Sequence, residues 1–234
     1  MTRLRAWVGL TACALLSSAS SAAAADLTTR SVPQRPIYVT AGGGPNILGT
    51  TAVAIRAARF NGSWAHAMQD ASRSPLLQAL VAPARTLTPM QKLAYVQSRV
   101  HNSVRWISDA TEWGQHDYWA SASETLAHGA GDMEDRAIVK MHALRALGFS
   151  PSDLWLTLAR DRVGGPITVL TVRFAGRYYI LDDTGGAPFL ADSRLREFQP
   201  IFSFGSSTAW VHTRNAAAPP IRTASSATAP YARK

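Results

Sequence analysis

The side chains best suited to nucleophilic or metal chemistry are scarce in this sequence of 234 residues. Its single cysteine is Cys13. No G-x-S-x-G nucleophile turn and no H-E-x-x-H zinc motif occurs. A glycine-rich stretch from Gly44 imitates a phosphate-binding loop, but Thr50 stands where the lysine of that loop belongs. The histidines lack the spacing of metal ligands, which favours surface or core positions for His101, His116, His128, His142 and His212.

The N-terminus predicts a secretory signal peptide over residues 1–25. Arg3 and Arg5 precede a short apolar core, and a run of small residues ends in an A-x-A cleavage site before Asp26. A short membrane anchor and a lipoprotein signal ending at Cys13 are the alternatives. Cleavage would remove the only cysteine and leave no thiol nucleophile or thiolate ligand. We therefore expect a periplasmic or secreted protein.

Composition bounds the remaining function classes. Hydrophobic residues make up 47% and charged residues 17%, which is typical of a globular chain. No apolar run after residue 25 reaches the ~18 residues of a membrane span. Loss of Arg3 and Arg5 lowers the formal charge from +9 to +7. Without a clustered Lys/Arg patch, this charge excludes nucleic acid as a partner and favours a solvated surface over acidic polymers or lipid headgroups.

Helices are predicted in the first part of the chain. Thr88-Pro89 starts a helix over 88–106, and residues 50–70 are compatible with a weaker helix. The clearest helix covers 133–147. Asp132 is its expected N-cap, and Met133 heads a stripe of apolar residues at helical spacing, which continues through Ala137, Met141 and Leu144.

Strands are predicted in the second part, at 154–158, 167–174 and 178–181, with two more at 202–204 and 209–211. Helices followed by strands indicate an α+β fold. Residues 26–49 are predicted to form an irregular lead-in, residues 50–214 the folded domain, and residues 215–234 a disordered tail rich in Ala, Pro, Ser and Thr.

Between Ser98 and Asp183 the sequence carries a series of ordered motifs. They are Asp109, Trp113-Gly114, Asp117-Tyr118-Trp119, Glu124-Thr125-Leu126, Gly131-Asp132-x-Glu134-Asp135, Lys140, Leu144 to Gly148, Val169-Leu170-x-Val172 and Leu181-Asp182. This series closely resembles the bacterial transglutaminase-like cysteine peptidase family, whose best-studied members are periplasmic proteases that clip cell-surface adhesins. The resemblance implies a transglutaminase-like, papain-like fold with helices packed on an antiparallel sheet.

The resemblance also implies that the catalytic triad is degenerate. Met133 stands at the position of the family's cysteine and Ile167 at that of its histidine, so that only Asp182 of the triad positions is retained. A thioether cannot form an acyl intermediate, and an isoleucine cannot move a proton. Two interpretations of the replacements remain open. Either Met133 and Ile167 fill the core, which the stripe favours, or they line an apolar groove that receives a peptide.

Asp182 has lost its expected histidine partner. An unpaired carboxylate is costly to bury, so we expect Asp182 to face solvent in the turn 182–186. The alternative is a buried Asp182 held by a backbone donor or an arginine.

Relatives in the resembled family bind calcium through the two acids that flank the cysteine, and both are present as Asp132 and Glu134. The resemblance thus implies calcium as a cofactor, since hard oxygen ligands suit this ion. Simple capping of the helix start is the alternative. The aromatic residues Trp106, Trp113, Tyr118 and Trp119 are expected to close the core beside this helix or to form a platform for a peptide or glycan.

The sequence therefore predicts that the protein is an exported, catalytically inactive peptidase homologue. It would bind a segment of an exported or membrane protein, with calcium dependence. An active hydrolase with an unrecognised nucleophile and a purely structural interaction protein are the alternatives.

Overall fold

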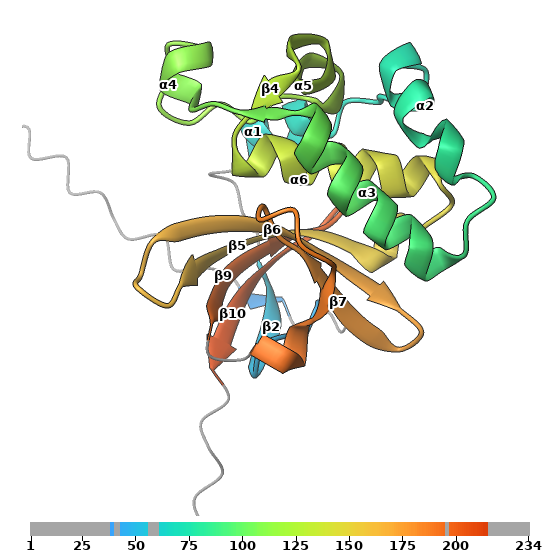
Figure 1. Cartoon of the computed structure of the whole chain (residues 1–234). Coiled ribbons are helices and arrows are strands. Elements are labelled where there is room, and N and C mark those ends of the chain that lie inside the picture. The colour runs from blue at the N-terminus through green and yellow to red at the C-terminus, as the bar shows by residue number, and fades with distance from the viewer. Residues whose placement is uncertain (1–37, 40–42, 56–60, 195–196, 215–234) are drawn as a thin grey trace, which may run out of the picture. The chain divides into compact units, whose positions relative to one another are not determined.

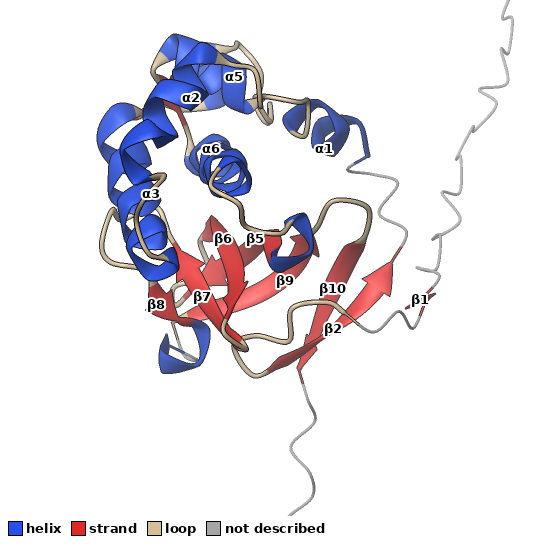
Figure 2. Ribbon diagram, turned by 90° about the vertical axis from the view of Figure 1, so that its right-hand side faces the viewer, coloured by secondary structure: helices blue, strands red, loops and turns tan. Residues whose placement is uncertain are grey.

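The strands and helices segregate into two layers, as the order of predicted elements indicates. The computed structural model describes residues 38–39, 43–55, 61–194 and 197–214, all within one compact unit. The helices gather on one face of a strongly curved sheet (Figures 1 and 2). The predicted signal peptide over residues 1–25 and the predicted tail over 215–234 lie outside the described residues.

Among the described residues, eight strands form one sheet in the order β1-β2-β10-β9-β5-β6-β7-β8. All of its neighbouring strands run antiparallel, which confirms the α+β prediction. The strands are β1 (Tyr38–Val39), β2 (Thr50–Ile55), β5 (Leu154–Asp161), β6 (Pro166–Phe174), β7 (Arg177–Leu181), β8 (Phe189–Leu190), β9 (Phe198–Phe204) and β10 (Ala209–Arg214). A separate parallel pair joins β3 (Arg105–Trp106) to β4 (Ala130–Gly131).

The helices are α1 (Asn61–Ala67), α2 (Pro75–Val81), α3 (Pro89–Ser103), α4 (Asp109–Glu112), α5 (Ala122–His128) and α6 (Met133–Ala146). Short 3₁₀ turns cover Ala82–Ala84, Pro151–Asp153 and Ala191–Arg194. No helix of the described chain is long and apolar enough to cross a membrane. The predicted helix at 88–106 is confirmed as α3 up to Ser103, whereas residues 105–106 form strand β3 instead, because they pair with β4. Thr88 is the N-cap of α3, and the side chain of Gln91 accepts a hydrogen bond from the Thr88 amide at 3.0 Å.

One prediction for the N-terminal part is wrong. Residues 50–55 form strand β2 rather than the start of a helix, and helix begins only at α1. Strand β2 is held between β1 and β10, with Trp210 paired to Ala54. Pairing with a strand about 155 residues away overrides the weak local preference for helix.

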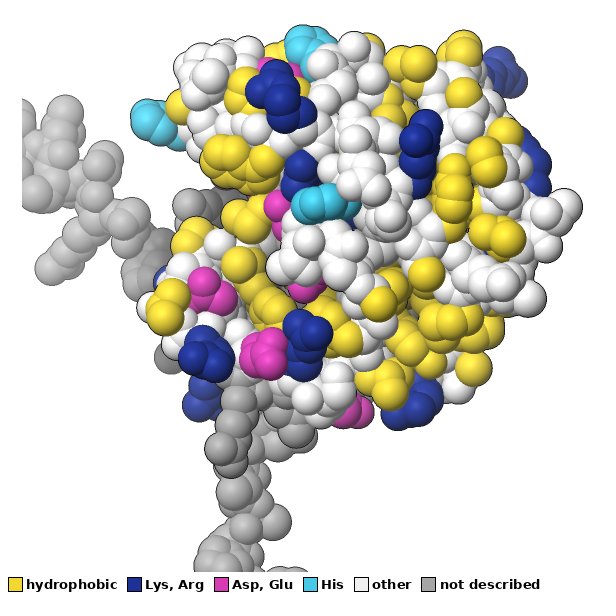
Figure 3. Space-filling view, in the orientation of Figure 1, with side chains coloured by type: hydrophobic (Ala, Val, Ile, Leu, Met, Phe, Trp, Pro, Cys, Tyr) yellow, Lys and Arg dark blue, Asp and Glu magenta, His cyan; other side chains and the backbone are white. Residues whose placement is uncertain are grey.

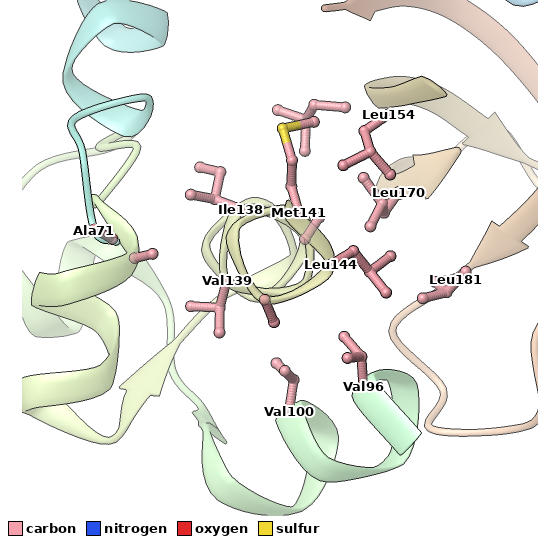
Figure 4. Packing of buried hydrophobic residues seen from close by; sticks show 14 of the residues in the cluster. Ala71, Val96, Val100, Ile138, Val139, Met141, Leu144, Leu154, Leu170 and Leu181 are labelled. Atoms are coloured by element: carbon pink, nitrogen blue, oxygen red, sulfur yellow. The ribbon is translucent and has the colours of Figure 1, made fainter. Parts of the chain in front are cut away.

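Helix α6 lies at the centre of the helical layer, against strands β5 and β6 (Figure 4). Met141 and Leu144 contact the sheet side, whereas Val139 points toward Val100 of α3. Every residue from Asp135 to Leu144 is buried. The predicted one-sided stripe therefore understates the burial of α6, since helices pack around the rest of its circumference.

Candidate functional site

The start of α6 is the centre of the site. Strand β4 leads through Asp132 directly into Met133, the first residue of α6. Ala137, Met141 and Leu144 belong to the core, as the stripe predicts. Met133 is instead half-buried and lines a cavity of about 420 Å³. The expected core-filling role is therefore wrong for Met133, and the groove interpretation describes its position.

The cavity lies between the first turn of α6, the loop 113–121, the end of β5, the start of β6 and the middle of β9. Its apolar lining includes Trp119, Met133, Leu158, Ile167, Ile201 and Phe202. The pairing of β5 with β9 shifts register between Leu158 and Ala159, because Ile201 is an extra residue on β9. Such a bulge lets both Ile201 and Phe202 line the cavity, although consecutive strand residues normally face opposite sides.

Ile167 shares this cavity with Met133, so the structure brings the cysteine and histidine positions of the motif together. Ile167 also packs against the smaller apolar cluster that contains Val169 and Ile180. Neither side chain offers an ionisable group. The pair therefore provides an apolar surface where a thiolate and an imidazole would have to stand for papain-like chemistry.

Asp182 is buried, with 6% of its surface exposed, so the prediction that it faces solvent is wrong. One of its carboxylate oxygens accepts hydrogen bonds from Gln97 Nε2 at 3.1 Å and from the amide and hydroxyl of Thr184 at 3.1 and 2.8 Å. Its backbone carbonyl accepts from Gln97 and from the buried Lys140 amine. These donors offset the cost of burying the carboxylate. They come from residues whose proximity to Asp182 the sequence did not indicate.

Beside the cavity, three carboxylates converge. One oxygen each from Asp109, Asp132 and Glu134 lies within 4.8 Å of the others. Oδ1 of Asp109 and Oδ1 of Asp132 are buried and find no hydrogen-bond partner among the described residues. Asp132 occupies the N-cap position of α6 without a side-chain capping bond of normal geometry, although the amides of Glu134 and Asp135 lie near enough to its carboxylate to favour its charged form and so oppose the rise in its pKa that burial causes.

Burial together with the neighbouring negative charges raises the pKa values of Asp132 and Glu134 well above their usual range. Burial also raises the pKa of Asp109. A fourth acid, Asp135, follows Glu134 in the first turn of α6, and burial raises its pKa to about 8. The cluster is thus electrostatically costly when it holds neither protons nor a cation.

The residues present fit a calcium ion. Buried, unpartnered carboxylate oxygens at this spacing are what a hard cation requires, and backbone or water oxygens complete its usual shell of six to eight ligands. Asp109, Asp132 and Glu134 would hold the ion, which would neutralise their mutual repulsion. Sequence reasoning found Asp132 and Glu134 but did not place Asp109 beside them. Its place in the motif series was the available signal, since its burial and its approach to α6 arise only on folding.

The same acids also anchor the loop 113–121. The second oxygen of Asp109 accepts from the Tyr118 amide at 2.6 Å, and Asp135 accepts from the Ala120 amide at 2.8 Å. Gly131 allows this packing, because an added Cβ there would lie 2.8 Å from the Asp135 side chain. The acids therefore hold in place the loop that lines one side of the cavity.

The predicted aromatic cluster divides between core and surface. Trp119 is buried and packs edge-to-face against Trp64 and Phe204, whereas Trp106 is 54% exposed. Trp113 lies between Tyr118 and the exposed His128, with its ring tilted against both.

The five histidines considered in the sequence analysis all lie outside the lining of this cavity. His142 is buried against the carbonyl of Ala67, and His212 bridges Thr50 and Ser203. His66, which the sequence did not single out, contacts Glu124 at 2.7 Å and Tyr118 at 2.9 Å.

The bacterial transglutaminase-like cysteine proteinase family matches the chain over residues 69–213. The chain belongs to this family. The match spans α6, the acid cluster and the strands that line the cavity, and it confirms the resemblance seen in the motifs. No curated protein matches the chain.

Solved structures of Legionella pneumophila LapG have a similar fold to this protein, at 25% sequence identity. The calcium-bound LapG structure superimposes with a TM-score of 0.51 and covers 58% of this chain and 75% of LapG. The EGTA-treated LapG structure has the same TM-score and covers 63% and 81%. LapG has thus been solved both with calcium and after treatment with a chelator.

Proposed function

We propose that this protein is an exported, catalytically inactive member of its peptidase family that binds a polypeptide segment of an exported or membrane protein. Binding takes place at the Met133 cavity, beside calcium held by Asp109, Asp132 and Glu134. The observation that carries the proposal is Met133 itself, which lies at the first position of α6 and lines an apolar cavity.

Loss of catalysis follows from the side chains at the cavity. Cysteine peptidases place a thiolate at a helix N-terminus, where the helix dipole and a histidine lower the pKa of the thiol. Met133 and Ile167 supply neither group. Asp182, which would orient the histidine, is occupied by Gln97 and Thr184.

Calcium dependence is supported by the partnerless oxygens of the acid cluster and by the calcium-bound form of LapG. Export is supported by the signal-like sequence of residues 1–25. Protein recovered from the exported fraction should begin at Asp26.

The decisive test combines an activity assay with a binding assay. The purified protein, incubated with casein and with an adhesin fragment in excess calcium, should leave both intact. Crosslinking and capture should yield a stable complex with an exported or membrane protein, and a chelator should weaken it. Cleavage that persists in independent clean preparations would overturn inactivity and favour an unrecognised nucleophile.

Calcium binding is tested separately by thermal melting in excess calcium and in chelator. A ligand at about 100 times its dissociation constant adds roughly 2.7 kcal/mol, or about 5–11 °C for a domain of this size. The double variant Asp132→Asn, Glu134→Gln should lose this shift. If the double variant retains it, the ion binds elsewhere.

A further inference from the structure

The cavity at Met133 joins an apolar interior to a charged rim. Its interior carries Met133, Leu158 and Phe202, and its volume of about 420 Å³ exceeds that of a single large side chain. Asp117 and Glu134 line it on the side of the loop and of α6, and Arg160 is the basic residue among the described lining residues. Acids outnumber bases in the lining when no cation is bound, and a calcium ion at Asp132 and Glu134 leaves Asp117 as the one lining acid outside the cluster among the described residues.

The apolar interior determines what side chain a bound segment must present. Met133 and Ile201 are half-buried, so an entering aliphatic side chain would cover apolar surface that is now partly in contact with water. A methionine adapts its shape to different partners. A bulky aliphatic anchor such as leucine fits this interior, whereas alanine would leave most of it empty.

The rim determines the charge next to that anchor. The carboxylates of Asp132 and Glu134 are engaged when the acid cluster holds a cation. Asp117 is exposed, and its carboxylate accepts a single hydrogen bond within the described residues, from Trp119 Nε1 at 2.9 Å. On the face shown in Figure 3, acidic and basic side chains are interspersed and no extended basic patch is seen. Arg160, the basic lining residue, donates to the Gly164 carbonyl at 2.9 Å, so Asp117 is the charged lining residue that is left to pair with a bound segment.

The geometry of an extended chain indicates where in the bound polypeptide a basic residue must lie to reach Asp117. Side chains two positions apart in an extended chain point to the same side, about 7 Å apart. With the anchor inside the cavity, the residue two positions away lies at its rim. We propose that the cavity binds an extended polypeptide segment with a bulky aliphatic residue and, two positions away, a lysine or arginine that pairs with Asp117. This inference rests on the proposed function and specifies its partner.

Three capped, fluorescently labelled peptides test the proposal by anisotropy in excess calcium: GGLGKGG, GGLGEGG and GGAGKGG. The peptide with leucine and lysine should bind most tightly. Replacement of its leucine by alanine should weaken binding at least tenfold. Replacement of its lysine by glutamate should weaken binding by about two- to fivefold, as an ion pair at a solvent-exposed rim is worth little.

Variants at Asp117 separate charge recognition from general binding. Asp117→Asn should remove the preference for lysine over glutamate, since its amide oxygen still accepts from Trp119. Asp117→Lys should invert the preference, a result that misfolding cannot produce. Asp192→Lys, an exposed acid outside the cavity lining, is the matched control and should keep the parent preference. Ile201→Trp should fill the cavity and abolish binding of all three peptides.

The outcomes distinguish this inference from the proposed function. If peptides bind with the leucine requirement but Asp117 variants leave the charge preference unchanged, the inference fails and the proposed function stands. If no peptide binds in calcium while the melt shows a folded protein, both fail at this cavity. If the protein alone is a dimer that Ile201→Trp converts to a monomer, a second copy occupies the cavity and the inference is overturned.

Discussion

Replacing Glu134 by glutamine should stabilise the protein when no calcium is available. Glu134 shares its site with Asp109 and Asp132, whose ligand oxygens lie within 4.8 Å. Burial and the Asp132 charge raise the pKa of Glu134, so the folded protein holds a proton that the unfolded chain has released. Because the folded state binds more protons, stability in chelator falls as pH rises above the usual pKa range of a glutamate. Glutamine removes this penalty.

The magnitude follows from the spacing of the acids. Two ionised carboxylates 4.8 Å apart repel each other by about 3 kcal/mol at an effective dielectric constant of about 20. The cluster limits this repulsion by holding a proton, which itself costs a comparable amount at neutral pH. Glu134 is only half-buried, so solvent screening reduces the gain. We expect Glu134→Gln to add about 2 kcal/mol in chelator, or roughly 4–8 °C in melting temperature.

Calcium should remove this advantage. The parent gains stability from the bound ion, whereas the variant has lost one of three carboxylate ligands and should gain little. Melting curves at pH 7, in chelator and in excess calcium, measure both effects, with Asp192→Asn as an exposed control that should change neither. A variant that is less stable than the parent in chelator, or that gains as much from calcium, would refute the assignment of Glu134 to a cation site.

Three further predictions concern the framework of the site. Asp182→Ala leaves the buried Gln97 amide short of an acceptor and should cost about 1–3 kcal/mol in urea unfolding, whereas Asp182→Asn should cost less. Gly131→Ala places a Cβ 2.8 Å from Asp135 and should cost about 1–3 kcal/mol, while Gly62→Ala, in open space on α1, should not destabilise. Burial lowers the pKa of His212 to about 4 from 6.5. Because the unfolded chain then binds the extra proton, the parent should lose about 3 kcal/mol between pH 6.5 and 4 relative to His212→Asn. Parallel pH profiles for parent and variant would contradict this.

The elements that carry their own local signals were predictable from sequence. Helices α3 and α6 show helical spacing and start at Thr88-Pro89 and Asp132, and strands β5 to β7 are apolar runs joined by short turns. The order of the motifs also identified the family, because the motifs on either side of position 133 are present although a methionine stands there. Strand β2 escaped prediction, because its partner β10 lies at the other end of the domain.

The chemistry of the site depended on contacts between distant residues. The sequence by itself determined that position 133 carries a thioether and position 167 an isoleucine, and therefore that this chain lacks a thiolate–imidazole pair there. Tertiary structure alone decided that Met133 lines a cavity, that Asp109 joins Asp132 and Glu134, and that Asp182 is buried. The physical reason is that burial and electrostatic coupling arise from side chains far apart in sequence. Gln97 of α3 and Asp182, directly after β7, meet only because the chain folds.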